Sequence, residues 1–469
     1  MPVNSFDDYY MSWKPDIKNA TPPIYKALAE ILENDIKSGK LKPGTKLPPQ
    51  RELADFLDIN LSTVSRSIKL VMEKGLLSSS IGSGTFVSSD ADINTVILLE
   101  NDNEKIIEMG AILPDVPANK LLVSYIEELA KEQDCERYFQ YSMPDASKFY
   151  RETAIKWFNM NNLNVSNAEN ILFSAGGQNA ITAILASLFK SGDKIGTNKF
   201  IYPGLKTVAK MLGIQVIPIE EENNEITKKG LIHACKNEKI KGLYLIPDYS
   251  NPTTYSISDK GRRNIAEVAK SFDLIVIEDA INSMLRNKKS IPIAEYLKGN
   301  TIYISSLSKT IAPGLRLSYI YSPKAYYEKI KTALYNINIT VSSFLVEVAS
   351  RIINSKDLEK IINERKKRIV YRNKIFNKYL GDYEVLGEEQ CPFRWLILPE
   401  YFTGKSFELC AKKFGVKVYS SDRFSVGGKK SINAIRIAIT SAKSNEEFEK
   451  GIKIIKNLLE NNDEMDTLL

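Results

Sequence analysis

A lysine and an arginine lie seven residues apart in the run Ser306-Leu307-Ser308-Lys309-Thr310-Ile311-Ala312-Pro313-Gly314-Leu315-Arg316. The run is expected to leave a strand and turn tightly, so that one amine and one guanidinium stand at a fixed separation. A lysine amine can form a Schiff base with an aldehyde, and an arginine binds phosphate through paired hydrogen bonds. Lys309 and Arg316 therefore suit an aldehyde cofactor that carries a phosphate. The plainer interpretation of Lys309 is a surface lysine.

Other residues whose side chains could bind a cofactor follow expected strands elsewhere in the chain. The turn Gly176-Gly177-Gln178 opens a helix, whose free backbone amides could hold a phosphate. Tyr202 could stack on a planar ring, Asn251 could bind a ring hydroxyl, and Asp279 could pair with a pyridinium nitrogen. The plainer interpretations are a strand-to-helix connection for the glycines, a packing role for Tyr202 and a helix cap or solvated strand end for the acid.

These positions fall at the ends of short β-rich runs that alternate with helical stretches. The expected strands are 171–173, 193–196, 215–219, 242–246, 274–277, 301–305 and 317–321. Such alternation predicts an α/β fold with a mostly parallel sheet, covered by helices on both faces, in which ligands gather at the carboxyl ends of the strands. The chemistry is therefore expected at one edge of this sheet.

The N-terminal part, from Pro23 to about Val87, has a shorter and denser pattern. Apolar residues at helical spacing predict helices over about 24–32 and 51–57. A third helix is expected to begin with Ser62 as its N-cap, with Val64, Ile68 and Val71 facing inward. Its other face would carry Thr63, Ser65, Arg66 and Lys69, which suits a helix that enters a DNA major groove. Two strands, 76–78 and 85–87, joined by a glycine turn, would form a small wing.

Composition limits the class of protein. The chain has 469 residues, 43% hydrophobic and 26% charged, which suits about three globular units. A net charge of +7 does not by itself indicate nucleic-acid binding. The four cysteines are far apart and there is one histidine, His233, so neither a zinc site nor a disulfide framework is expected. Residues 1–13 lack a signal pattern, and we expect a soluble, cytoplasmic protein.

The N-terminal part resembles the winged helix-turn-helix domain of the GntR regulators. The matching residues are Leu41-Lys42-Pro43-Gly44-Thr45-Lys46-Leu47-Pro48, Arg51-Glu52-Leu53-Ala54, Ser62-Thr63-Val64 and Gly82-Ser83-Gly84-Thr85-Phe86-Val87. The resemblance implies an N-terminal arm over 1–20, a DNA-binding domain over 21–88 and a linker over 89–104. It also implies a set of residues that contact DNA: Arg51, Ser62, Thr63, Arg66, Gly82, Ser83, Gly84 and Thr85.

The remaining chain resembles the pyridoxal-phosphate aminotransferases of fold type I, over roughly residues 105–460. The resemblance implies a large subdomain over about 150–325 and a small one over about 330–469 together with 105–149. Lys309 would form the Schiff base with pyridoxal 5'-phosphate, and Arg436 would bind an effector carboxylate. The other implied contacts are to the cofactor ring and phosphate: Asp279 to the ring nitrogen, Asn251 to the phenolic oxygen, Tyr202 to the ring face, Gly177, Gln178, Ser306 and Arg316 to the phosphate, and Tyr141 to the phosphate of a partner subunit.

A GntR-like domain joined to an aminotransferase-like domain is the architecture of the MocR/GabR regulators. The resemblance implies a homodimeric transcription regulator that binds double-stranded operator DNA and senses pyridoxal phosphate or an amino compound. Several positions depart from the family pattern. The usual Glu-Asp-Asp-Tyr-Asp is Glu278-Asp279-Ala280-Ile281-Asn282 here, so a tyrosine expected beside the phenolic oxygen of the cofactor is absent. Thr254 stands where glycine is usual, and Ser250 where glutamine is common. Two alternatives therefore stay open, namely a working aminotransferase with a DNA-binding domain, and a DNA-binding protein whose body holds no cofactor.

Overall fold

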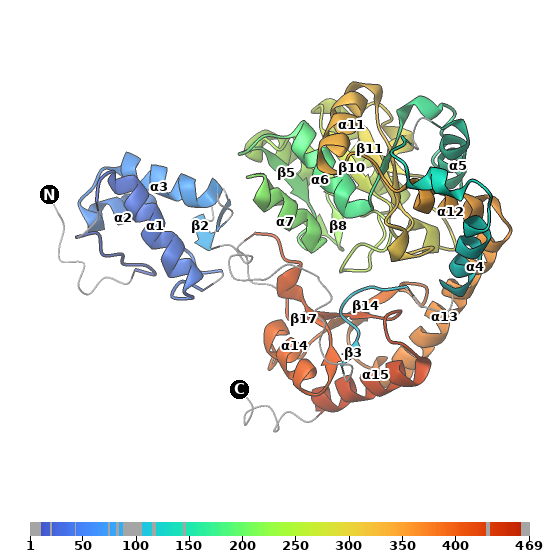
Figure 1. The fold of residues 1–469 in the computed structure, drawn as a ribbon. Helices are drawn as coiled ribbons and strands as arrows, with labels where there is room; N and C mark the ends of the chain where they lie inside the picture. The colour runs from blue at the N-terminus through green and yellow to red at the C-terminus, as the bar shows by residue number, and fades with distance from the viewer. Residues whose placement is uncertain are drawn as a thin grey trace.

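The computed structural model describes residues 11–18, 21–42, 44–73, 76–80, 84–87, 106–114, 119–143, 147–427 and 432–460. The chain forms an N-terminal helical domain and a larger α/β body (Figure 1). The body is built on a seven-stranded sheet, in the spatial order β4-β12-β11-β10-β9-β5-β6. These strands are β4 (Ile171–Ser174), β5 (Lys194–Thr197), β6 (Gln215–Pro218), β9 (Gly242–Leu245), β10 (Ile275–Asp279), β11 (Thr301–Ser306) and β12 (Ser318–Tyr321).

The sheet is mostly parallel, as the alternating pattern predicted. β12 runs antiparallel to both of its neighbours, β11 and β4, whereas the pairs among β11, β10, β9, β5 and β6 are parallel. Successive side chains of one strand enter different cores: Leu243 and Leu245 pack in one cluster, and Tyr244 and Ile246 pack in another. Helices therefore cover both faces of the sheet, which is why its central strands are continuously apolar.

The helices of the large subdomain pack on these faces. They are α5 (Lys148–Asn159), α6 (Gly177–Leu188), α7 (Pro203–Met211), α8 (Lys228–His233), α9 (Asp259–Ser271), α10 (Ile293–Tyr296), α11 (Lys324–Asn338) and α12 (Ser343–Asn354), with α4 (Asn119–Ala130) and the 3₁₀ turn η2 (Cys135–Phe139) beside α12. A short hairpin, β7 (Glu221–Glu222) and β8 (Glu225–Ile226), lies between β6 and α8.

The small subdomain is a second, antiparallel sheet with two helices. Its strands follow the order β13-β14-β17-β16, formed by β13 (Val385–Leu386), β14 (Phe393–Ile397), β17 (Ala434–Ala438) and β16 (Tyr419–Ser420). β15 (Val416–Lys417) pairs in parallel with β3 (Ile107–Glu108), and the helices are α14 (Gly404–Lys413) and α15 (Asn445–Glu460). α13 (Asp357–Leu380) joins the two subdomains (Figure 1), because Leu358 packs in the core of the large one and Phe376 in that of the small one.

The division between the subdomains differs from the expected one. We expected 105–149 and everything beyond about 330 in the small subdomain. Leu122, Leu129 and Tyr138 pack instead in the same core as Val346 and Ile352, which lies on the large sheet. Apolar burial thus places α4, η2, α11 and α12 with the large subdomain.

The N-terminal domain has a core of its own. It contains α1 (Ile24–Lys37), α2 (Gln50–Leu57), α3 (Leu61–Glu73) and the antiparallel strands β1 (Leu77–Ser80) and β2 (Gly84–Val87). Trp13 is buried in this core and donates a 2.8 Å hydrogen bond from Nε1 to Asp35, so residues 11–18 pack as part of the domain. The expected linker, 89–104, lies outside the described residues.

The structure corrects the predicted start of the third helix. α3 begins at Leu61, so Ser62 lies in its first turn. The Asn60 side chain provides the cap, because its Oδ1 accepts the Ser62 backbone N–H at 2.8 Å. The inward positions Val64, Ile68 and Val71 are buried as predicted.

Within the described part of the chain, no helix is long and apolar enough to cross a membrane. The same residues contain no group of three or more His, Cys, Asp or Glu side chains arranged to hold a metal ion.

Candidate functional site

The strand order brings the predicted site residues to one edge of the large sheet. Ser306, Ser318 and Ser174 lie side by side across β11, β12 and β4. The chain therefore leaves β4 toward Gly177, leaves β11 toward Lys309 and enters β12 from Arg316 at the same place. Of the neighbouring strands, β10 ends at Asp279, β9 leads to Asn251 and β5 leads to Tyr202. These residues are far apart in sequence but adjacent in the fold because parallel strands end together.

A cradle for an anion lies after β4. Gly176 precedes α6 with φ +88°, a conformation that glycine adopts without strain, and a Cβ there would lie 2.7 Å from Nη2 of Arg316. A Cβ on Gly177 would meet open space. The first amides of α6 and the exposed Arg316 guanidinium, which donates to Ala175 O at 2.9 Å, thus flank an open volume. A helix N-terminus and a guanidinium together suit a phosphate.

Asp279, the last residue of β10, is buried under the site. Its Oδ2 accepts a 2.7 Å hydrogen bond from the Tyr244 hydroxyl, and its Oδ1 accepts the Ile281 amide at 3.2 Å. Burial raises the pKa of Asp279 to about 6, while the Tyr244 and Ile281 bonds and the charge of Lys309 act in the opposite direction. The carboxylate is therefore ionised at neutral pH but is close to taking up a proton.

Lys309 lies in the loop after β11, half-buried among charged groups. Its Nζ donates to the backbone carbonyl of Ile112. Burial, together with the positive charges of Arg436 and Arg316, lowers the pKa of the Lys309 amine to about 8, and the negative charge of Asp279 partly offsets these effects. These mutual effects show that the two predicted anion-binding arginines and the predicted ring partner surround one amine.

Arg436 reaches the same place from β17 of the small subdomain. It is 1% exposed and donates to Asn251 Oδ1 at 2.5 Å and to the Gly110 carbonyl. Burial lowers the pKa of the Arg436 guanidinium to about 10. Its hydrogen bonds to described residues go to neutral oxygens, and its Nε has no partner among them. A buried guanidinium without a carboxylate partner among these residues is prepared for an anionic ligand.

Buried polar atoms without a partner give a direct test of whether a ligand fits. Arg436 Nε, Gln178 Oε1 and Ser250 Oγ make no hydrogen bond to any described residue. Each such atom costs roughly 1–3 kcal/mol when it stays unpaired in a folded protein. Gln178 lies in the first turn of α6 and Ser250 in the loop after β9, at the sheet edge that carries the site, and the charge of Arg436 acts on Lys309. A polar ligand that carries at least one anionic group fits these atoms. The residues present therefore fit the phosphorylated aldehyde expected from the sequence.

The remaining predicted residues divide into two groups. Tyr202, at the start of α7, lies within the site, because the charges of Asp279, Arg316 and Arg436 all act on its pKa, which burial raises. Gln178 Nε2 donates to Gly204 O at 3.0 Å beside it. Ser306 is buried and its Oγ bonds that of Ser308 at 3.1 Å.

Tyr141 stands outside this set. It is 87% exposed, on the chain that follows η2. None of the contacts that join the other predicted residues includes it.

The departures from the family pattern have structural counterparts. Thr254 has φ +65°, the left-handed region that favours glycine, which explains why glycine is usual there. Ala280 is buried in the apolar core, and Ile281 contributes its backbone amide to Asp279. The support of Asp279 therefore does not depend on the side chains at positions 280 and 281.

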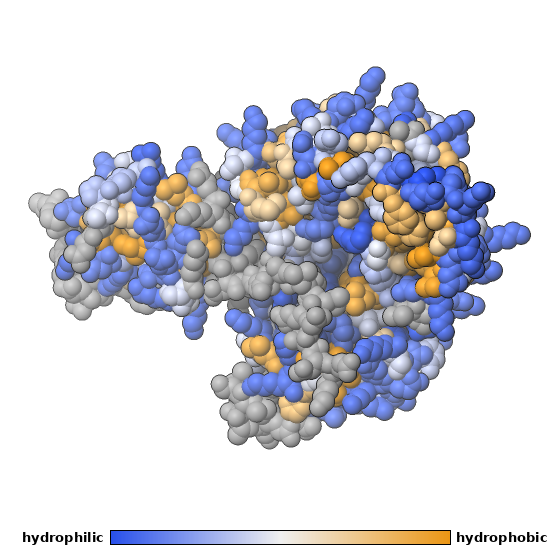
Figure 2. Space-filling view, in the orientation of Figure 1, coloured by the Kyte–Doolittle hydropathy of each residue, from blue (hydrophilic) through white to orange (hydrophobic). Residues whose placement is uncertain are grey.

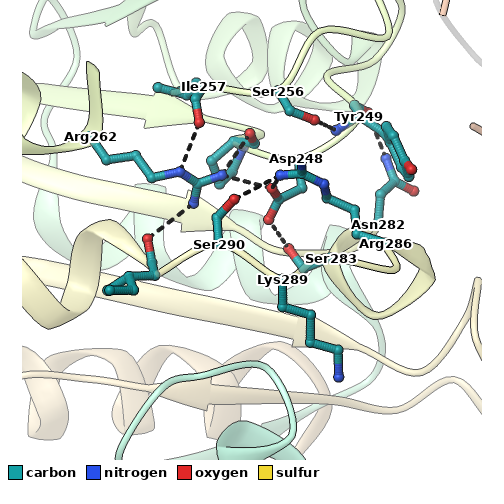
Figure 3. A network of polar contacts seen from close by, with 12 residues as sticks. Asp248, Tyr249, Ser256, Ile257, Arg262, Asn282, Ser283, Arg286, Lys289 and Ser290 are labelled. Atoms are coloured by element: carbon teal, nitrogen blue, oxygen red, sulfur yellow. Dashed lines mark hydrogen bonds and ion pairs between the residues drawn. The ribbon is translucent and has the colours of Figure 1, made fainter. Parts of the chain in front are cut away.

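A buried ion network stabilises the strand ends beside the site (Figure 3). Asp248 Oδ1 accepts from Arg262 and Arg286 at 2.7 Å each, and Oδ2 accepts from Ser283 at 2.6 Å. Arg262 also donates to the carbonyls of Ile257 and Pro247 at 3.0 Å. With each oxygen of the carboxylate bonded, the network fixes the loops after β9 and β10.

Sequence reasoning missed two features of the site. The first is Tyr244, whose hydroxyl supports Asp279. Its register offers the signal: Tyr244 pairs with Ile277, so it shares a sheet face with Asp279 two residues further on. The second is the segment 106–114, whose carbonyls contact both Lys309 and Arg436. No local pattern in that segment marks this role.

In the N-terminal domain, the predicted DNA-contacting residues lie on α2, α3 and β2. Arg51, Ser62 and Arg66 are exposed, and Thr63 is partly exposed. The Arg66 guanidinium stacks on the ring of Tyr25, 4.1 Å from its centre, which restricts its position. Of the predicted wing residues, Gly84 and Thr85 lie on β2, whereas Gly82 and Ser83 fall outside the described residues.

Comparisons with known families match both parts of the chain. Residues 24–87 match the family "Bacterial regulatory proteins, gntR family", and residues 104–455 match "Aminotransferase class I and II". The structure is similar to that of an archaeal alanine:glyoxylate aminotransferase, with a TM-score of 0.69, 23% identity and coverage of 76% of this chain and 91% of that chain. It is also similar to a kynurenine aminotransferase of Pyrococcus horikoshii, with a TM-score of 0.70, 21% identity and coverage of 77% of this chain and 92% of that chain. These likenesses confirm the fold.

Curated relatives resemble the chain over both parts. The chain is 48% identical over 461 residues to YdeF of Bacillus subtilis (strain 168), an uncharacterized HTH-type transcriptional regulator, covering 98% of this chain and 99% of that protein. It is 25% identical over 349 residues to the HTH-type transcriptional regulator NorG of Staphylococcus aureus (strain N315), covering 67% of this chain and 76% of that protein. The protein therefore belongs to the HTH-type transcriptional regulators that join a GntR DNA-binding domain to an aminotransferase class I and II domain, the MocR/GabR architecture expected from its sequence.

Proposed function

We propose that this regulator holds pyridoxal 5'-phosphate in the cleft around Lys309 and that it senses either this cofactor or an amino compound. The observation that carries the proposal is the charge arrangement of the cleft. One amine lies among Arg316, Arg436 and Asp279, with an open anion cradle on one side. Such a site suits a ligand that is anionic at one end and can accept a proton at the other.

Each residue has a defined task in this scheme. Arg316, Ser306, Gln178 and the Gly177 end of α6 would bind the phosphate. The ring would lie against Tyr202, with its nitrogen at Asp279 and its hydroxyl at Asn251. When bound, the cofactor supplies an aldehyde that combines with amines and a ring that withdraws electrons. Asp279, whose carboxylate accepts a hydrogen bond from Tyr244, would pair with the ring nitrogen and favour its protonated form.

The lowered pKa of Lys309 prepares it as a nucleophile. Only the neutral amine attacks an aldehyde. With a pKa of about 8, about a tenth of the amine is neutral at pH 7, whereas at the ordinary value the neutral fraction is several hundredfold smaller. Burial and the two neighbouring arginines thus raise the reactive fraction.

Arg436 indicates the chemical class of the effector. Its buried guanidinium, with Nε free of a partner among the described residues, suits a carboxylate. A pocket beside Lys309 is lined by Ile112, Leu285 and Ile369, among others, with Arg368 also contributing. We therefore propose an amino acid or a related amino carboxylate as the small-molecule effector.

The regulator binds DNA through its GntR domain, and we propose Arg51, Ser62, Thr63, Arg66 and the wing as the contacts. Short hydroxyl side chains at the start of α3 allow close approach to base edges.

In Figure 2, apolar residues gather on the side of the body where α4 lies. Val123 on α4 and Phe139 on η2 are 51% and 74% exposed, and Tyr141, two residues after Phe139, is 87% exposed. This surface supports a homodimer, whose two-fold symmetry suits paired half-sites on DNA. The proposed location is the cytoplasm, where such DNA lies.

Spectroscopy and DNA binding together test the proposal. Purified protein is titrated with pyridoxal phosphate, and its affinity for a duplex selected from a random pool is measured with and without the cofactor. We expect a visible absorbance band in the wild type and in Lys288→Ala, an exposed-lysine control, and none in Lys309→Ala. Lys309→Ala should still bind the duplex but lose the response to cofactor. Equal spectra of Lys309→Ala and wild type would refute the scheme.

The second candidate is a working aminotransferase that carries a DNA-binding domain. The observation that favours it is the intact set of Lys309, Asp279, Arg316 and Arg436. Turnover of an amino acid with a keto-acid acceptor, at a kcat within the usual range for enzymes of about 1–1000 per second, would support this candidate. Amine binding without turnover supports the sensor.

A further inference from the structure

Residues 106–114, which we call the strap, are the first described residues after the linker from the DNA-binding domain. The strap begins on the small subdomain as β3. Ile107 N donates to Gly415 O at 2.8 Å, Met109 N to Lys417 O at 2.9 Å, and Met109 O accepts from Ala438 N at 2.7 Å. Ile107 and Met109 are buried in the small-subdomain core. The start of the strap is therefore fixed to the small subdomain, as Figure 1 shows for β3.

The second half of the strap lies on the two site cations. Lys309 Nζ donates to Ile112 O, and Arg436 Nη2 donates to Gly110 O. Both acceptors are backbone carbonyls, so they depend on where the chain runs and not on which side chain it carries. The strap thus contacts the large subdomain through Lys309 and the small one through Arg436.

A few contacts hold this half of the strap in place. Ser441 Oγ donates to Ala111 O and accepts from Leu113 N, the latter at 3.0 Å. Glu108 Oε1 accepts the amides of Gly110 and Ala111 at 2.8 and 2.7 Å. Gly110 lies so close to the Tyr419 ring that a Cβ would be 2.8 Å from a ring carbon. The strap therefore fits closely but with few bonds beyond the two cations.

Ligands compete with the strap for these cations. Once the Lys309 nitrogen is bonded to a cofactor carbon, it no longer offers the three N–H donors of a free ammonium group. A carboxylate at Arg436 makes a charge-assisted pair that is stronger than a bond to the neutral Gly110 carbonyl. Loading the cleft therefore removes the bonds from Lys309 and Arg436 to the strap, so that among the described residues only the Ser441 and Glu108 hydrogen bonds of its far half remain. It also leaves the Ile112 carbonyl without its donor, which is unfavourable for a buried group.

We infer that the strap is an occupancy sensor: the cofactor and a carboxylate effector displace residues 110–113, and this displacement reaches the DNA-binding domain through the adjoining linker. The inference rests on the proposed function and names its regulation. A ligand shifts such an equilibrium only by its difference in affinity for the two states. That difference arises here because the strap-bound state occupies the same two cations as the ligand.

Ser441→Ala tests the sensor without altering a residue assigned to cofactor or effector. It removes both Ser441 contacts and weakens the strap-bound state. We expect pyridoxal phosphate to bind about three- to tenfold more tightly than to the wild type, as the loss of one or two neutral hydrogen bonds implies. Without cofactor, the variant's affinity for the selected duplex, and the rate at which a protease cuts the 88–105 segment, should both move toward the values of the cofactor-loaded wild type.

Gly110→Ala provides a second variant, since its methyl group would lie 2.8 Å from a carbon of the Tyr419 ring, so that the strap or the ring must shift. Gly299→Ala is the matched control, because a Cβ at Gly299 meets no atom within 4 Å. Thermal melting of both variants shows whether they fold, and Ser441→Ala carries the test if Gly110→Ala does not. Wild-type cofactor affinity and wild-type DNA response in Ser441→Ala would overturn the inference and leave the proposed function intact. A wild type that binds no cofactor would instead remove the proposed function.

Discussion

Replacing Tyr244 with phenylalanine tests whether ionised Asp279 prepares the cleft for its cofactor. The Tyr244 hydroxyl donates a 2.7 Å hydrogen bond to Asp279 Oδ2, and both side chains are buried. Burial raises the pKa of Asp279 to about 6, and this bond is one of the contacts that limit the rise. The substitution removes one hydroxyl and keeps the ring. The Tyr244 carbonyl keeps its 3.0 Å bond from Thr197 Oγ1.

The expected shift follows from the strength of the lost bond. A hydrogen bond to a charged group contributes about 1.5–3 kcal/mol, and one pKa unit corresponds to about 1.4 kcal/mol. The pKa of Asp279 should therefore rise by roughly one to two units from its value of about 6. At pH 7 the ionised fraction of Asp279 would fall from about nine tenths to between about a half and a tenth.

The measurement is the pH dependence of pyridoxal-phosphate affinity, followed by absorbance. An ionised carboxylate holds a protonated ring nitrogen best, so affinity should fall as the pH drops through the pKa of Asp279. The midpoint should lie one to two units higher in Tyr244→Phe than in the wild type. The phosphate of the cofactor also titrates near pH 6, at about its second pKa. The test therefore rests on the difference in midpoint pH between Tyr244→Phe and the wild type, and not on the wild-type midpoint alone.

Tyr319→Phe is the matched control. Tyr319 is fully buried in β12 and packs in the core on the other face of the sheet from Tyr244. Its substitution should leave the midpoint unchanged. If Tyr244→Phe and Tyr319→Phe gave the same midpoint as the wild type, the ionisation of Asp279 would not control cofactor binding and the reasoning would fail.

Three further predictions concern stability. Trp13→Ala should destabilise the N-terminal domain by about 3–5 kcal/mol, because it empties a buried site, with a smaller loss in Trp13→Phe; denaturant unfolding measures both. Arg262→Met should lower the stability of the body by about 3–5 kcal/mol, since it removes a buried partner of Asp248, whereas the exposed Arg263→Met should not. Burial raises the pKa of Asp279 to about 6 and of Glu278 to about 7, so the folded protein binds extra protons between about pH 4 and pH 7; the cofactor-free protein should melt at lower temperature as the pH rises through that window.

The sheet was predictable because each strand carries its own signal. Runs such as 242–246 and 301–305 are short and rich in aliphatic and aromatic residues. The structure places all seven strands within two residues of the expected limits. Their parallel direction follows from the intervening helices. The edge at which they end then locates Lys309, Asp279 and Asn251 together without further information.

Features that depend on tertiary contacts were not predictable in the same way. The cap of α3 falls on Asn60 instead of Ser62, because both residue types suit a cap and only the helix phase decides between them. The subdomain boundary differs because α12 packs in the core on the large sheet, and its sequence does not specify which core covers it. The contact of Lys309 with Ile112 joins residues 197 positions apart, through a backbone carbonyl that every residue has. No pattern of side chains in the sequence can indicate such a contact.

The charge balance of the cleft explains why the strap and the ligand should exclude each other. Lys309, Arg316 and Arg436 place three cations around one carboxylate, Asp279, and the two arginines lower the pKa of the lysine. In the cofactor-free state, carbonyl dipoles of the strap offset part of this excess at Lys309 and Arg436. A phosphate and a carboxylate would offset it more completely, because full negative charges interact with these cations more strongly than dipoles do. The excess positive charge that attracts the ligands is thus the same charge that holds the strap while they are absent.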